Sequence, residues 1–73
     1  MRVGKANSLG FLLLTSIIQG EETNFLAKAS SISVIVEHKD GAFIHFGHKE
    51  GIVTSETMTE IFDQLDNIDP NML

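Results

Sequence analysis

Apolar residues dominate the segment Phe11–Ile18, which reads FLLLTSII. They occupy both alternating faces, whereas a strand with one face in water carries polar residues at every second position. We therefore expect a strand over residues 9–18 that is covered on both sides. The following QGEETN, residues 19–24, is then a turn that pivots on Gly20, and a short second strand is expected over residues 25–29.

The segment 34–46 reads VIVEHKDGAFIHF and predicts a β-hairpin. If Lys39 and Asp40 form a type I turn and Gly41 takes a left-handed conformation, the loop has three residues and ends in a G1 bulge. A two-residue Asp-Gly turn is the alternative, and it changes the pairing of the two strands. A slip of one residue exchanges the faces of one strand relative to the other.

The hydrophobic pattern favours the three-residue loop. One face of the hairpin then collects the apolar residues Ile32, Val34, Val36, Ala42, Ile44 and Phe46. The other face carries Ser33, Ile35, Glu37, Phe43 and His45. This second face is less polar than a face in water should be. We expect strands over residues 32–38 and 42–47, with Ile35 and Phe43 pointing away from the core.

A helix is expected over residues 57–67. It begins with a capping box, in which the Thr57 hydroxyl accepts from the amide of Glu60 and the Glu60 carboxylate accepts from the amide of Thr57. Apolar residues follow at helical spacing and form one stripe of Met58, Ile61, Phe62, Leu65 and Ile68. Pro70 ends the helix, residues 68–73 form a tail, and Asn71 to Leu73 are expected to be frayed.

These elements predict an α+β fold. A turn over GHKEG, residues 47–51, precedes a last short strand, and the C-terminal helix follows. The fold is a small antiparallel β-sheet or partly open barrel of about four to five strands with one C-terminal helix, all in a single domain spanning 1–73. The expected strands are 9–18, 25–29, 32–38, 42–47 and 51–54.

Composition narrows the possible functions. The chain has 73 residues and no cysteine, which excludes disulfides, thiolate zinc sites and cysteine nucleophiles and is compatible with a reducing cytoplasm. We expect a cytoplasmic protein. Ten acidic against five basic residues give a formal net charge of −5. That is the wrong sign for binding by phosphate neutralisation, so nucleic-acid binding is not expected.

The N-terminus resembles a signal peptide in one respect, because Arg2 and Lys5 precede the apolar run. The run is shorter than the roughly 20 residues needed to span a bilayer. No small-x-small cleavage site follows it. We therefore expect a buried strand rather than an export signal, and no membrane partner.

The chemistry-bearing residues predict neither an enzyme nor a cofactor. A metal site would need His38, His45 and His48 to converge, together with Glu50. His45 and His48 are three positions apart, which places them on opposite faces of a strand. The chain also lacks nucleophile-elbow and phosphate-loop glycine patterns. We expect no metal, no cofactor and no catalysis.

The unburied apolar residues predict self-association. A chain this short without cysteine gains stability by pairing with another copy, and one helix cannot cover two apolar faces. We expect a homo-oligomer, most simply a two-fold dimer, whose interface residues are Phe11, Leu13, Ile17, Ile35, Phe43 and His45. The alternative is a monomeric barrel in which the N-terminal strand covers the Ile35 and Phe43 face.

About two thirds of the chain resembles the FlbD-like flagellar family and similar short phage and plasmid proteins. The matching positions are Leu14-Thr15, Gly20, Phe25-Leu26, Ala29, Ile32, Val53 and Thr57 to Ile61. Two positions depart from the family pattern: Lys28 replaces the usual asparagine, and Glu56-Thr57 replaces a glutamate-serine pair. The resemblance implies a small accessory protein without catalytic residues.

Sequence alone therefore predicts a non-enzymatic, self-associating β-rich accessory or protein-interaction module with an unidentified protein partner. The alternative is a small transcriptional, phage or plasmid regulator that contacts nucleic acid. Salt dependence separates the two, because phosphate-driven binding weakens steeply as salt rises.

Overall fold

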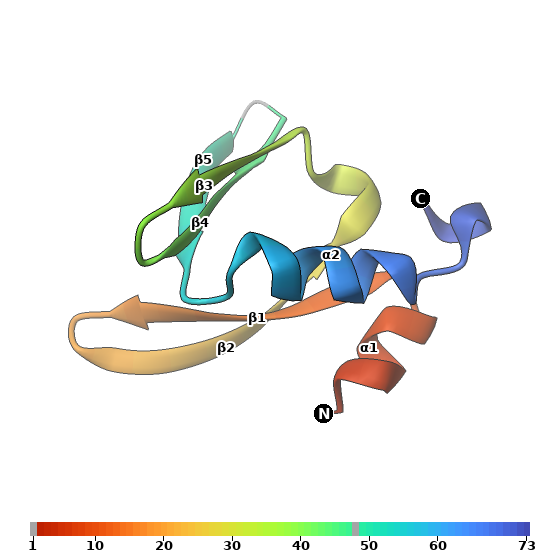
Figure 1. Cartoon of the computed structure of the whole chain (residues 1–73), viewed down its shortest axis with the longest axis horizontal. Helices are drawn as coiled ribbons and strands as arrows, with labels where there is room; N and C mark the ends of the chain where they lie inside the picture. Colours follow the sequence, from red (N-terminus) through yellow and green to blue (C-terminus); the bar gives the residue numbers. More distant parts are fainter. Residues whose placement is uncertain (1, 48) are drawn as a thin grey trace.

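The computed structural model describes residues 2–47 and 49–73 and contains two small antiparallel sheets that do not close into a barrel (Figure 1). In chain order the elements are α1 (Val3–Ser8), β1 (Phe11–Ile18), β2 (Glu21–Lys28), the 3-10 helix η1 (Ala29–Ser31), β3 (Val34–His38), β4 (Gly41–Phe46), β5 (Lys49–Thr54), α2 (Met58–Asp66) and the 3-10 helix η2 (Pro70–Met72). Strands β1 and β2 form one sheet, and β3, β4 and β5 form the other in that order. The predicted α+β class is confirmed, and α1 is an addition to it.

A tight turn joins β1 to β2. Gln19 and Gly20 have φ angles of 52° and 81°, and two consecutive positive values are typical of a type I′ hairpin turn. The turn places Ile18 opposite Glu21. Strand β2 therefore begins four residues earlier than the hydrophobic pattern indicated, because the polar residues after the turn already pair with β1.

The register of the β3–β4 hairpin differs from both pairings considered above. His38 pairs with Gly41 and Ile35 with Ile44, so the loop consists of Lys39 and Asp40 alone. Gly41 has a φ of 150°, and a Cβ atom there would collide with the carbonyl oxygen of Thr54 on β5. The glycine thus allows two backbones to approach closely within the sheet, whereas a left-handed bulge was predicted.

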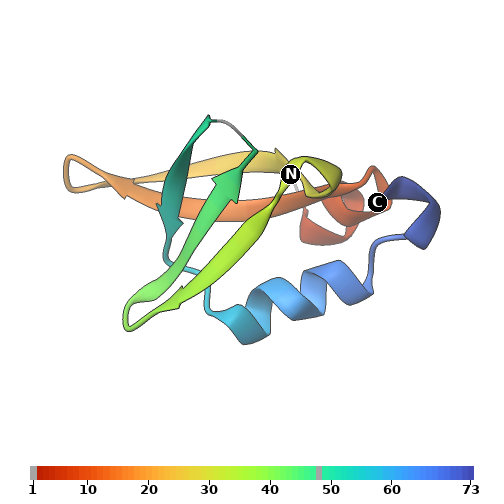
Figure 2. The same cartoon turned by 90° about the horizontal axis from the view of Figure 1, so that it is seen from above.

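The core lies where the two sheets cross and α2 packs beside them (Figure 2). Leu12 and Leu14 of β1 are fully buried, as are Ile44 of β4 and Ile61 of α2. The other buried members of this cluster are Ala27, Ala29, Ala42 and Ile68. The partly buried residues packed against it are Phe25, Ile32, Ile35, Phe46, Met58 and Leu65.

Helix α2 begins with the predicted capping box. The Thr57 hydroxyl accepts from the Glu60 amide at 3.2 Å, and the Glu60 carboxylate accepts from the Thr57 amide at 3.2 Å. The predicted apolar stripe is wrong at Phe62, which is 54% exposed. The inward side of the helix is centred instead on Ile61 and Gln64, both of which are buried.

The segment after α2 has more regular structure than the tail that the sequence predicted. Ile68 is buried in the core, and Pro70–Met72 forms the 3-10 helix η2. Asp69 caps this helix, because its carboxylate accepts from the Asn71 amide at 2.9 Å. Within the described part of the chain, no helix is long and apolar enough to cross a membrane.

Candidate protein-contact surface

The outer face of the three-stranded sheet carries a group of exposed apolar side chains. Val34 and Val36 of β3 and Val53 of β5 are 51%, 45% and 47% exposed. Phe43 lies between Val36 and Val53 in the register, and His45 lies opposite Val34. We call these five residues the sheet face. Three aliphatic side chains in water around an aromatic residue form an apolar surface of the kind that marks contact sites.

The Phe43 ring lies at the centre of the sheet face and packs over Gly51. A Cβ atom on Gly51 would come within 2.6 Å of the Phe43 ring, so the ring lies over this glycine. The Phe43 and His45 rings are 4.6 Å apart between centroids and meet edge to face at 72°. This arrangement is favourable for two aromatic rings. The sheet face therefore has a preorganised aromatic centre.

Ile17 extends the sheet face onto β1. It lines a hollow of about 240 Å³ with Asp40, Val53, Thr54 and Ser55, and its side chain is 55% exposed. Of the six predicted interface residues, the structure therefore places Ile17 beside the sheet face and includes Phe43 and His45 in it.

Ile35 does not share a face with Phe43, which corrects the prediction. Ile35 is opposite Ile44 and packs against the core, whereas Phe43 is opposite Val36. The predicted face was wrong because the two-residue loop shifts the pairing by one position, and side chains alternate along a strand. The same shift turns Val34 and Val36 outward, although both were expected to be buried.

Phe11 and Leu13 lie elsewhere. They are half-buried and alternate along β1 with the fully buried Leu12 and Leu14, so they occupy the face of the two-stranded sheet that is turned away from the core. Helix α1 packs against this end of β1 (Figure 1). The predicted interface residues therefore fall into three separate places.

One edge of β1 is closed by side chains, a feature that sequence reasoning missed. Gln64 of α2 binds both backbone groups of Leu13: its Oε1 accepts from the amide at 2.8 Å, and its Nε2 donates to the carbonyl at 2.9 Å. Two residues on, the Thr15 amide donates to the Glu56 carboxylate at 2.7 Å. The Ser55 amide donates to the Thr15 carbonyl at 2.8 Å.

Helix α1 completes this closure. The Asn7 side-chain amide donates to the Phe11 carbonyl at 2.8 Å and to Oε1 of Gln64 at 3.0 Å. We call this side of β1, at Phe11, Leu13 and Thr15, the sealed edge. The sequence held one signal for it: Gln64 falls between Ile61 and Ile68 on the inward side of the helix, and a buried amide needs hydrogen-bond partners.

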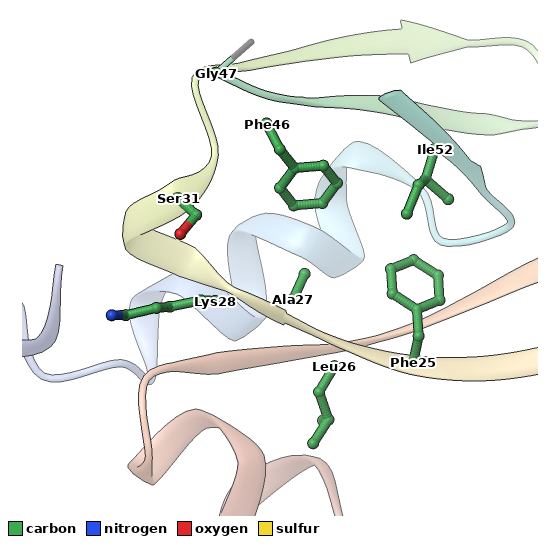
Figure 3. A pocket seen from close by; sticks show the side chains of 8 residues that line it. All are labelled: Phe25, Leu26, Ala27, Lys28, Ser31, Phe46, Gly47 and Ile52. Carbon is green, nitrogen blue, oxygen red and sulfur yellow. The ribbon is translucent and has the colours of Figure 1, made fainter. Parts of the chain in front are cut away.

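A second hollow, of about 470 Å³, lies beside β2 (Figure 3). The side chains of Phe25, Phe46 and Ile52 point toward one another across it, whereas Leu26 points away. The remaining lining residues are Ala27, Lys28, Ser31 and Gly47. Its walls therefore come from β2 and η1 and from β4, Gly47 and β5, with no residue from β1 among those that line it.

The described residues do not bring together the histidines that a metal site would need. His38 and His45 stand at opposite ends of the β3–β4 hairpin, about four positions or roughly 13 Å apart along the strand direction. His48 and the side chain of Glu50 lie outside the described part of the chain. Among residues 2–47 and 49–73, no three histidine, aspartate or glutamate side chains gather as metal ligands would.

Comparison with known proteins adds no relative. No family model matches the chain, no curated protein matches it, and no solved structure matches its fold. The resemblance to the FlbD-like family therefore stays a prediction.

Proposed function

We propose that this protein is a small, non-enzymatic accessory module that self-associates and binds a protein partner. The observation that carries the proposal is the sheet face, in which Val34, Val36 and Val53 surround the ring of Phe43. An aromatic centre within an apolar patch has the composition of the buried middle of protein interfaces. The cysteine-free chain suits a reducing cytoplasm, where we place its action.

The charge of the chain indicates the chemistry of the partner. The net charge is −5, and Asp40 stands beside Val53 where the sheet face meets Ile17. Charged groups at the rim of an interface steer the encounter and exclude partners of like charge. The occupant of the sheet face is therefore an apolar protein segment flanked by basic side chains.

Photo-crosslinking in the source cells tests the proposal. A benzophenone amino acid replaces Val36 on the sheet face, and in a matched control it replaces Asp63 on the exposed side of α2. We expect an adduct of one discrete mass from position 36 and none of that mass from position 63. The adduct should fall by about tenfold or more when Val34→Ser and Val53→Ser are added, because two apolar contacts are lost.

Two results would contradict the proposal. Equal adducts from positions 36 and 63 would mean that the sheet face attracts nothing specific. An adduct that persists at full yield in the double serine variant would mean that the apolar side chains do not hold the partner. Circular dichroism of the purified variants verifies that the fold is retained.

A further inference from the structure

The outer edge of β2 carries backbone groups without partners in the described structure. The backbone groups of Leu13 and Thr15 point away from β2, because they bind Gln64, Glu56 and Ser55 instead. In an antiparallel ladder, the residues opposite such positions also turn their amides and carbonyls outward. The register identifies them as Glu22, Asn24, Leu26 and Lys28. We call this side of β2 the open edge.

The open edge is long and regular. Strand β2 has eight residues without proline, and no strand of the described chain pairs with its outer side. Edges of this kind accept a further strand, because each added residue pair satisfies free backbone donors and acceptors. The chain satisfies the sealed edge with its own side chains, but the described residues provide no equivalent on β2.

The charges of the open edge are self-complementary in one antiparallel register. When two copies of β2 pair around a two-fold axis at Phe25, Glu22 of each copy faces Lys28 of the other, and Asn24 faces Leu26. The residues whose backbone amides and carbonyls face the open edge then all meet as hydrogen-bonded pairs. Moving the axis to Asn24 or Leu26 also aligns the backbone groups, but it places neither Glu22 nor Lys28 opposite a charge. Opposite charges across a strand pair are stabilising.

The core side of the same register is also complementary. Phe25 of one copy faces Phe25 of the other across the axis, and aromatic pairs are among the stabilising cross-strand contacts. A strand added to the open edge runs along the hollow lined by Phe25, Phe46 and Ile52. The Phe25 of the added strand points to the same side of the sheet as this hollow, so its ring leaves water there.

We propose that two copies of this chain form a two-fold dimer by antiparallel pairing of their β2 strands in the register centred on Phe25. The two-stranded sheets then become one four-stranded sheet across the dimer. This inference rests on the self-association in the proposed function and names its site. It leaves the sheet face of each copy free for the protein partner.

Charge-reversal substitutions, with the molecular mass measured by sedimentation equilibrium, test the dimer. The parent should sediment at twice the 8.0 kDa mass of the chain. Glu22→Lys places two lysine pairs across the axis and Lys28→Glu places two glutamate pairs, so each should weaken the dimer by about tenfold or more. A mixture of the two variants should restore the dimer, as should the double variant, because opposite charges then face each other again.

Matched controls carry the same change of net charge at exposed sites away from β2. Asp63→Lys corresponds to Glu22→Lys, and Lys39→Glu corresponds to Lys28→Glu. Both controls should sediment like the parent. Thermal unfolding at low concentration verifies that every variant folds, because Glu22 and Lys28 are exposed in the single chain.

The outcomes separate this inference from the proposed function. A parent that remains at 8.0 kDa at 100 μM overturns both the self-association and this site. A dimeric parent whose mass is unchanged by the single variants, or whose dimer is not restored by mixing them, overturns the β2 register alone and leaves self-association standing.

A disulfide scan supplies an independent measurement of the register, because the chain has no cysteine. Phe25→Cys should form an interchain disulfide under mild oxidation, since position 25 meets itself across the axis. Thr23→Cys should not, because position 23 faces Ala27 of the other copy. Faster crosslinking at position 23 than at position 25 would contradict the proposed axis.

Discussion

The two edges of the β1–β2 sheet differ in whether their backbone groups have hydrogen-bond partners. On the sealed edge, side chains from α1, α2 and the β5–α2 connection bind the backbone of Phe11, Leu13 and Thr15. On the open edge, the equivalent groups of β2 have no partner within the described chain. Leu13 and Leu26 are directly opposite each other. In this one pair, the backbone groups of Leu13 are bound by Gln64, and those of Leu26 face the open edge. This small domain therefore closes one edge by itself, and the other is the edge at which we propose that two copies pair.

Among the changes at the sealed edge, removing the Gln64 side-chain amide should lower the free energy of unfolding the most. Gln64→Leu replaces the amide with an apolar side chain of similar size and leaves the amide and carbonyl of Leu13 without partners. We expect a loss of about 4 kcal/mol in the free energy of unfolding, from a total of roughly 4–11 kcal/mol for a domain of 73 residues. Urea denaturation measures it. The neighbouring exposed substitution Asp63→Leu should change stability by less than about 0.5 kcal/mol.

Proline at the Leu13–Leu26 pair compares the two edges directly. Leu13→Pro removes the amide that donates to Gln64, whereas Leu26→Pro removes an amide that has no partner among the described residues. We expect Leu13→Pro to cost about 3 kcal/mol more than Leu26→Pro in denaturation at micromolar concentration. Leu13→Ala and Leu26→Ala correct for the lost side chains. Equal costs after that correction would show that the two edges do not differ.

Glu56→Gln should weaken the sealed edge without opening it. The carboxylate accepts from the Thr15 amide at 2.7 Å, and a hydrogen bond to a charged group is stronger than one to a neutral amide oxygen. We expect a loss of about 1 kcal/mol in the free energy of unfolding. A cost as large as that of Gln64→Leu would contradict this ranking.

Amide hydrogen exchange should detect the difference between the sealed edge and the open edge without any mutation. The amides of Leu13 and Thr15 should exchange slowly, because both are bound in the sealed edge. The amides of Asn24 and Leu26 should exchange fast in dilute solution and become protected as concentration rises and β2 strands pair. Fast exchange at Asn24 and Leu26 in a sample that sediments as a dimer would place the contact elsewhere.

The sequence predicted correctly those features that depend only on residues close together in the chain. The capping box of α2 was predicted correctly because Thr57 and Glu60 are three positions apart. The helix α1 was missed because its six residues contain a glycine and no apolar stripe. The predicted stripe of α2 failed at Phe62 because its burial depends on where the helix packs. The same packing places Gln64 against β1.

Only part of the candidate surface was predicted, because the orientation of its side chains also depends on packing between elements. Phe43 and His45 were correctly expected on the face turned away from the core, but Val34, Val36 and Ile35 were assigned to the wrong sides. Their orientation depends on the close approach of Gly41 to Thr54. That contact is made with β5, which lies outside the β3–β4 hairpin, so the pattern within the hairpin alone cannot specify it.

The hydrogen bonds from Gln64 to Leu13 can form only late in the synthesis of the chain. The two residues are 51 positions apart, so at 5–20 residues per second Gln64 is made about 3–10 s after Leu13. During that interval the apolar strand β1 exists without the helix that closes its edge. Chains that end before Gln64 should therefore be the most prone to aggregation, and ribosome-bound nascent chains of this length should bind chaperones most strongly.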